Sequence, residues 1–178
     1  MRASIFALVA GAALGLAACS DGGPSGPNTV TTLEAVSPAA GATGIDPASP
    51  IAVRFSGAMG IGMERYVDLH QGDVGGPVVP MACTWSNDRA TLTCTPGTHL
   101  ASGTGYALHV GSGMMDANNR PVDVEGHGTQ MGGHRVTGQM MGGMHAGQAT
   151  GLMGPGWRHA GDAHMGMAFA FETGPSAS

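Results

Sequence analysis

Alternation of apolar and polar residues dominates the middle of the chain and predicts β-strands. Residues 51–55 and 106–110 place an apolar side chain at every second position, which is the period of a strand with one buried face. Clusters of Gly, Pro, Asn and Asp separate these segments from their neighbours. The predicted strands are 33–37, 51–55, 66–70, 79–85, 90–94, 106–110 and 167–171. Short strands, frequent turns and no helical periodicity of useful length predict an all-β sandwich.

The chain begins with an apolar run of a different kind. One Arg precedes residues 5–18, and the run ends in the sequence LAAC. We interpret 1–18 as a signal peptide, too short to be a membrane-spanning helix. Its end resembles the lipobox of bacterial lipoproteins, which implies cleavage before Cys19, a lipid on its thiol and attachment to the membrane. Ser20 after the cysteine implies the outer membrane by the same resemblance; the alternative is an ordinary signal peptide cut at an A-x-A-like site.

Composition divides the remainder of the chain. Residues 19–32 are rich in Gly, Pro and Ser, so we expect a flexible tether. Residues 33–124 plus 167–174 carry the predicted strands and should form the sandwich. Between them lies an insertion, 125–166, and we expect 175–178 to be a disordered tail.

The fourth and fifth predicted strands allow a specific pairing. A two-residue turn at Asp88 and Arg89 places Cys83 opposite Cys94, with the apolar residues of both strands on one face. Directly opposed residues lie near the distance that a disulfide requires. Because an exported protein resides where the bond can form, we predict a Cys83–Cys94 disulfide. The alternative is a reduced cysteine pair that binds metal.

Segments throughout the sandwich resemble bacterial Ig-like domains of the SbsA type. VSPAAGATGIDPASPIAVRFSGAM matches the opening of that pattern, RATLTCTP and LASGTGYALHV match later strands, and DANNRP and FET match a turn and the closing strand. The resemblance implies a seven-stranded antiparallel Ig-like β-sandwich that serves as an extracytoplasmic structural or binding module. It brings no catalytic residues. The chain departs from the pattern at Cys94, which replaces an apolar residue, and in the long insertion.

The insertion has a composition unlike the rest of the chain. Residues 126–167 contain thirteen Gly, seven Met and five His, but only two aliphatic residues larger than Ala, Val136 and Leu152. So little apolar surface does not offset the entropy of ordering a segment. We therefore expect a long disordered loop before the last strand, and we assign Met167 to the core.

Met and His recur in the insertion among glycines, a pattern that indicates transition-metal binding. Thioether ligands select Cu(I), whereas imidazole suits Cu(II), zinc and nickel. The scarcity of carboxylates argues against calcium or magnesium, and the lack of cysteine argues against a closed structural zinc site. We predict binding of copper or a related metal, with Cu(I) held by Met and Cu(II) by His. The candidate ligands are His127, Met131, His134, Met140, Met141, Met144, His145, Met153, His159, His164 and Met165.

Further methionines should lie near this insertion. In an Ig-like sandwich the loop between the second and third strands shares a pole with the loop before the last strand. That arrangement places Met59, Met63, Met114 and Met115 at the same end as the insertion. Loop methionines of this kind often cap a core instead of binding a ligand.

Other functions remain open on the sequence alone. The insertion is a low-complexity linker if the domain is a structural or adhesive module of the cell envelope, and exposed Met could also scavenge oxidants. We do not expect an enzyme, because no Ser/His/Asp arrangement stands out. Nucleic acid is not an expected partner either, since the chain has no Lys and its seven Arg are scattered among twelve acidic residues.

Overall fold

The computed structural model describes residues 29–137 and 164–175, in which strands make up most of the regular structure. Two short helices are also present, η1 (Met63–Tyr66, a 3₁₀ helix) and α1 (Glu125–Gln130). The strands are β1 (Leu33–Ser37), β2 (Ile51–Phe55), β3 (Val67–Gln71), β4 (Val78–Val79), β5 (Met81–Trp85), β6 (Thr91–Pro96), β7 (Gly105–Val110), β8 (His134–Thr137) and β9 (His164–Glu172). Within these two ranges we find no helix with the length and apolar character needed to cross a membrane.

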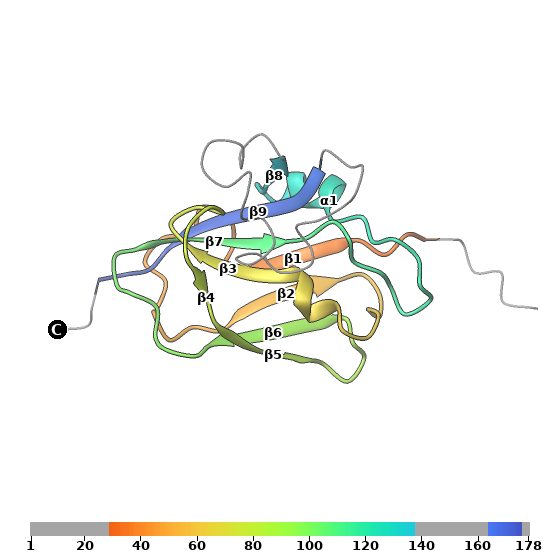
Figure 1. Cartoon of the computed structure of the whole chain (residues 1–178), viewed down its shortest axis with the longest axis horizontal. Helices are drawn as coiled ribbons and strands as arrows, with labels where there is room; N and C mark the ends of the chain where they lie inside the picture. Colours follow the sequence, from red (N-terminus) through yellow and green to blue (C-terminus); the bar gives the residue numbers. More distant parts are fainter. Residues whose placement is uncertain (1–28, 138–163, 176–178) are drawn as a thin grey trace, which may run out of the picture.

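The strands form two antiparallel sheets that pack face to face (Figure 1). One sheet has four strands in the order β1-β2-β6-β5, and the other has five in the order β4-β3-β7-β9-β8. The pairing of β7 with β9 joins the middle of the chain to its end. The described chain starts at one pole of the sandwich and ends at the other, as Figure 1 shows. The predicted all-β Ig-like sandwich is confirmed.

The core lies between the two sheets and uses the alternation read from the sequence. Val53 in the first sheet and Leu69, Leu108 and Phe169 in the second are completely buried. Each such side chain contributes about 1.5–3 kcal/mol relative to an exposed position. Met167 is also fully buried and belongs to the core cluster, which confirms its assignment.

The predicted register of β5 and β6 is confirmed. Cys83 pairs with Cys94 on the ladder, and their sulfur atoms form a disulfide with an S–S distance of 2.04 Å. The turn is wider than the two residues predicted. The Ser86 N–H donates to the Thr91 carbonyl at 2.8 Å, and the Ser86 carbonyl accepts from the Arg89 N–H at 2.8 Å. Side-chain oxygens of the turn bind further backbone N–H groups, which stabilises this longer loop.

The prediction of a disordered insertion is wrong at both of its ends. Residues 125–137 contain α1 and β8, and β9 begins at His164, before the predicted start of the last strand. Together with the two-residue strand β4, β8 adds to the seven strands predicted. The remaining part, 138–163, lies outside the described residues.

The predicted tether of residues 19–32 also ends earlier than expected. The Asp123 N–H donates to the Thr31 carbonyl at 2.9 Å, and the Leu33 N–H donates to the Asp123 carbonyl at 3.1 Å. Thr31 is only 6% exposed. The last residues of the predicted tether therefore belong to the sandwich, whereas the predicted signal peptide and Cys19 lie outside the described residues.

Candidate functional site

The predicted metal-binding insertion begins with the short helix α1, whose two ends are defined by the backbone. The Asp123 carboxylate accepts the Gly126 N–H at 2.8 Å, which satisfies one donor at the start of the helix. At the other end Gly132 has a positive φ of 80°, and its N–H donates to the Thr129 carbonyl. The Gly133 N–H reaches the Gly128 carbonyl at 3.0 Å. These two bonds form a Schellman motif, which explains how a glycine-rich segment can end a helix cleanly.

Helix α1 packs along one edge of the sandwich, against β1 of one sheet and β8 and β9 of the other. Glycine residues allow this close packing, because they have no side chain. A Cβ atom at Gly128 would lie 2.7 Å from Cγ of Met167, and one at Gly133 would lie 2.5 Å from a ring carbon of Phe169. The glycines therefore have a packing role in this part of the insertion.

Two predicted ligands lie within α1 and directly after its last residue. His127 and Met131 are four residues apart, a spacing that brings side chains together on a helix. His127 is half-buried, and Met131 packs partly against the hydrophobic core. Met131, which the sequence predicted as a metal ligand, therefore also packs against the core.

Two further predicted ligands lie on the neighbouring strand pair. His134 in β8 is exposed and pairs with Ala168 of β9, while His164 pairs with Thr137 at the far end of the same ladder. Gly166 in β9 has φ 101°, and a Cβ there would collide with the Val110 carbonyl oxygen. This irregular position lies beside Met165 and bends β9 where the insertion rejoins the sheet.

The structure therefore places part of the predicted ligand set at one edge of the sandwich. Backbone positions are described for His127, Met131, His134, His164 and Met165. The other predicted ligands, Met140, Met141, Met144, His145, Met153 and His159, lie outside the described residues. Among the positions that are described, no group of three His, Cys, Asp or Glu side chains could hold a metal ion.

The additional methionines at this pole serve the core. Met59 and Met114 are fully buried and Met63 is 7% exposed. The Met63 sulfur accepts the Met115 N–H at 3.2 Å, which ties the loop after β2 to the segment after β7. The disulfide likewise removes Cys83 and Cys94 from the set of thiolate ligands.

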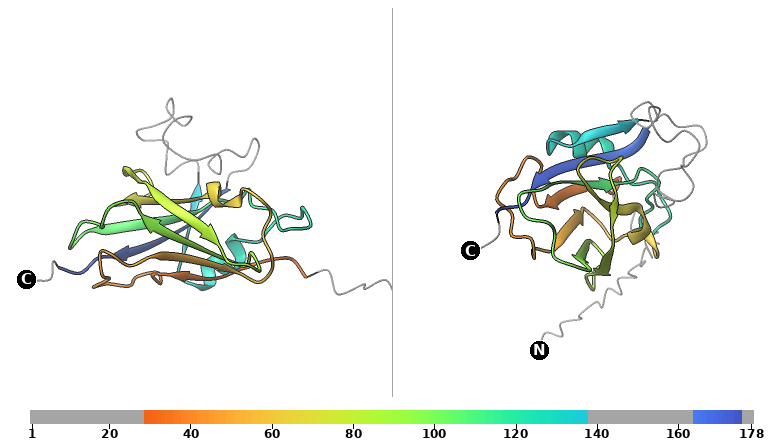
Figure 2. Two further views of the ribbon diagram at one scale, coloured as in Figure 1. Left: turned by 90° about the horizontal axis from the view of Figure 1, so that it is seen from below. Right: turned by 60° about the vertical axis from the view of Figure 1, so that its left-hand side comes forward.

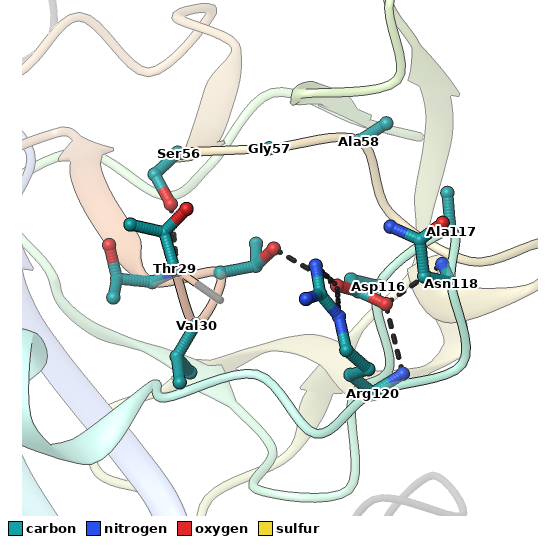
Figure 3. Close-up of a pocket in the computed structure, with 11 residues that line it drawn as sticks. Thr29, Val30, Ser56, Gly57, Ala58, Asp116, Ala117, Asn118 and Arg120 are labelled. Atoms are coloured by element: carbon teal, nitrogen blue, oxygen red, sulfur yellow. Dashed lines mark hydrogen bonds and ion pairs between the residues drawn. The ribbon is translucent and has the colours of Figure 1, made fainter. Parts of the chain in front are cut away.

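An open pocket of about 500 Å³ lies at the same pole, where the described chain begins (Figure 3). Thr29 and Val30 form one side, the backbone of residues 56–58 another, and Asp116 and Arg120 the third. The sequence predicted only a turn at 116–121. The sequence did not indicate this pocket, because a single sequence does not show that Asp116 is buried.

The Asp116 side chain binds the backbone of the turn that it begins. Its carboxylate accepts the backbone N–H of Asn118 at 2.8 Å and of Arg120 at 2.9 Å, and it forms an ion pair with the Arg120 guanidinium at 2.9 Å. Burial raises the pKa of this carboxyl, but the hydrogen bonds and the Arg120 charge outweigh burial, so the pKa lies below the ordinary 3.8. Because these contacts stabilise the turn, we assign the Asp116 carboxylate a structural role.

Comparison with known proteins finds solved structures that are similar to about half of this chain. No curated protein matches the chain significantly. Similar solved structures include the S-layer protein rSbsC, with 16% identity and a TM-score of 0.40 over 53% of this chain and 12% of that one. An L,D-transpeptidase from Mycobacterium smegmatis has 25% identity and a TM-score of 0.38, over 48% of this chain and 38% of that one. CopC from Methylosinus trichosporium OB3b has 19% identity and a TM-score of 0.40, over 52% and 84%.

The chain thus spans much less than half of the S-layer protein and of the transpeptidase. The family assignment rests on a different comparison. The profile of the bacterial Ig-like domain matches residues 27–125, which is more than half of the sequence. This range includes β1 to β7 and ends where α1 begins. The chain belongs to the bacterial Ig-like domain family.

Proposed function

We propose that the protein is an Ig-like module of the bacterial cell envelope that binds copper or a related transition metal through its Met- and His-rich insertion. The observation that carries the proposal is the position of the described ligands. His127, His134 and His164 belong to α1, β8 and the start of β9, which contact one another at one edge of the sandwich. They bracket residues 138–163, which hold the other candidate ligands.

Placing some ligands on the sandwich has a physical advantage. A ligand on a regular element loses less conformational freedom when a metal binds than a ligand in a flexible chain. His134 and the pair His127–Met131 would thus provide fixed donors, to which residues from 138–163 add. Imidazole and thioether together suit copper in both oxidation states.

The proposal is tested by titrating the soluble mature chain with Cu(I), Cu(II), Zn(II) and Ni(II) under identical conditions. His127, His134, His145, His159 and His164 are replaced together by Ala in one variant. Met131, Met140, Met141, Met144, Met153 and Met165 are replaced together by Leu in a second variant, because Leu keeps the volume and lacks the sulfur. We expect the first variant to lose Cu(II) and the second to lose Cu(I), each by at least about tenfold in affinity.

Matched controls lie elsewhere on the domain. His99 is an exposed residue outside the insertion, and Met81 is a half-buried residue of β5. His99→Ala and Met81→Leu should leave both affinities unchanged. Equal binding by the wild-type chain and by a variant without 138–163 would reject the metal function and favour a structural or adhesive module with a linker.

Anchoring to the envelope forms the second part of the proposal. The apolar segment 5–18 followed by Cys19 supports export and lipidation, and the Gly/Pro-rich residues that follow support a tether. We assign the domain a binding role without catalysis, because the family resemblance provides no catalytic residues. The outer membrane is the expected location, since Ser20 follows the lipidated cysteine.

A further inference from the structure

Strand β5 forms one margin of the four-stranded sheet, at the end opposite β1 (Figure 1). The left view of Figure 2 looks onto this margin, with β5 in front. The margin at β1 has a cover, because the Leu33 N–H donates to the Asp123 carbonyl and α1 packs against β1. In the part of the chain that the structure describes, no strand pairs with the outer side of β5. Strand β5 is thus an open edge of the sheet.

The ladder between β5 and β6 determines which backbone groups of β5 point outwards. Hydrogen-bonded and non-hydrogen-bonded pairs alternate along an antiparallel ladder. The Ser86 N–H donates to the Thr91 carbonyl at 2.8 Å, whereas Cys83 and Cys94 form a non-hydrogen-bonded pair with a Cα–Cα distance of 4.0 Å. Every second residue of β5 therefore directs its N–H and C=O away from β6, and within the described ranges no hydrogen bond reaches these groups. The outward residues are Met81, Cys83 and Trp85.

The side chains of these outward residues point into the sandwich but are incompletely covered. Cys83 is bonded to Cys94, and the Trp85 ring lies 6.1 Å from the ring of Phe55. On the neighbouring strand β6 the inward side chain of Cys94 is 0% exposed. Met81, Cys83 and Trp85 are only half-buried. The apolar interior of the sandwich is therefore accessible at the β5 edge.

An open pocket of about 320 Å³ lies beside this edge. Val67 of β3, Val79 of β4 and Met81 of β5 belong to its lining, which joins the two sheets. Val78, also in the lining, is 38% exposed and is one of three large apolar side chains exposed among the described residues. Burial of this surface by a partner is favourable.

Strand β5 also lacks the features that protect sheet edges from pairing. Charged side chains, bulges and prolines usually have this role. Residues 78–85 contain no charged side chain, and the register of β5 with β6 is continuous. Pro80 precedes the strand, and its carbonyl accepts the Gly97 N–H, so the side of Pro80 that lacks an N–H faces β6. The free side of β5 remains open to a further strand.

We infer that a second copy of the chain pairs with this edge, β5 against β5, antiparallel about a two-fold axis at Cys83. Met81 then lies opposite Trp85 of the second copy, and the outward N–H groups of each copy meet the outward carbonyls of the other. The uncharged strand favours its own copy as partner, because self-pairing brings no like charges together. The inward Trp85 of the second copy lies beside Met81, where the pocket opens, and loses apolar surface to water there.

The test is sedimentation equilibrium of the soluble mature chain with a metal chelator, which prevents Met and His from linking two copies through a metal. Ala82 and Thr84 are exposed, and each lies opposite the other across the two-fold axis. A variant with Lys at both positions (Ala82→Lys, Thr84→Lys) and one with Glu at both (Ala82→Glu, Thr84→Glu) should dimerise at least about tenfold more weakly than the wild-type chain. An equimolar mixture of the two variants should restore the dimer, because opposite charges then face each other.

The matched control places the same charge on the opposite side of the domain. Ala35 of β1 and Gln130 of α1 are exposed, so Ala35→Lys with Gln130→Lys should leave the dimer affinity unchanged. A wild-type chain that remains monomeric at about 1 mM overturns the pairing. Dimerisation of the double-Lys variant with wild-type affinity overturns it as well.

Hydrogen exchange of the wild-type chain gives a second readout that needs no folded variant. Raising the concentration from about 5 μM to about 1 mM should slow exchange of the outward amides at least about tenfold. The amides of Ala82 and Thr84 should change less, because their N–H groups already face β6. A dimer in which the amides of Met81, Cys83 and Trp85 gain no protection would place the interface elsewhere and overturn the proposal.

Discussion

Asp116 holds the turn of residues 116–120 together from a buried position. Asp116→Asn preserves the shape of the side chain but removes its charge and one acceptor, and it places an N–H donor beside the Arg120 guanidinium. We expect the free energy of unfolding, measured in urea, to fall by about 2 kcal/mol. Asp46→Asn is the matched control. Asp46 is exposed and its carboxylate accepts the Ala48 N–H at 2.8 Å, so we expect a change within about 0.5 kcal/mol.

The depressed pKa of Asp116 also predicts how stability depends on pH. A carboxyl whose folded pKa lies below its unfolded value stabilises the fold above the unfolded pKa, and this contribution is lost as the pH falls through the folded pKa. The difference in unfolding free energy between wild type and Asp116→Asn should therefore be full at pH 7 and shrink below the ordinary value of 3.8. Urea titrations at several pH values check this, and parallel stability curves would contradict it.

Single residues also mark the limit of prediction from one sequence. Alternation correctly assigned Leu69, Leu108 and Phe169 to the core, since a strand with one buried face has a simple period. The burial of His109 on the opposite face followed from no such pattern, because it depends on what covers the sheet. Gly128 and Gly133 likewise read as linker residues, although close packing against Met167 and Phe169 requires them.

The hairpin of β5 and β6 depends on its disulfide. Cys83 and Cys94 are separated by 11 positions, so the bond closes a short loop of the unfolded chain and should contribute about 3 kcal/mol. Reduction of the folded protein is expected to lower the urea midpoint accordingly. A Cys83→Ala, Cys94→Ala variant should show no response to the reductant. Two free thiols in protein purified without reductant would contradict the bond.

The docking of α1 and β8 on the sandwich can be tested through Gly133. Gly133→Ala would bring a Cβ within 2.5 Å of Phe169 and 2.9 Å of the Gly128 carbonyl oxygen, so the ring or the backbone must move. We expect a loss of about 1–3 kcal/mol in unfolding free energy. Gly105→Ala is the control, since a Cβ there has no neighbour within 4 Å, and its effect should stay near zero. Equal stability of the two variants would mean that the insertion does not pack here.

At the level of elements, the sequence was informative where side chains alternate and uninformative where glycines dominate. The register of β5 and β6 could be predicted because two cysteines and the apolar residues required the same pairing. Helix α1 and strand β8 could not, since they are short and stabilised by tertiary contacts with β1 and β9 instead of by their own pattern. The Gly132–Gly133 pair at the end of α1 was the available signal, because Gly is typical of helix ends.

The first described residues and the described ends of the insertion lie at the same pole of the sandwich. Thr29 and Val30 line the open pocket with residues 56–58, next to the loop that Met63 and Met115 tie together. A chain of ten residues from Cys19 to Thr29 spans at most about 35 Å when extended. If Cys19 carries a lipid, this pole therefore stays close to the membrane surface, together with the edge that carries the described candidate ligands.

The predicted lipidation of Cys19 determines the location of the protein in the cell, and a substitution at Cys19 tests it. Cys19→Ser removes the thiol that accepts the lipid, so the chain should either remain uncleaved or be released as a soluble exported protein. Partition between detergent and aqueous phases measures this, with wild type expected in the detergent phase. Ser20→Asp is the matched control, because it keeps the thiol and should still give a lipidated protein. Unchanged partition of Cys19→Ser, together with normal cleavage of the signal peptide, would exclude a lipid anchor at this position.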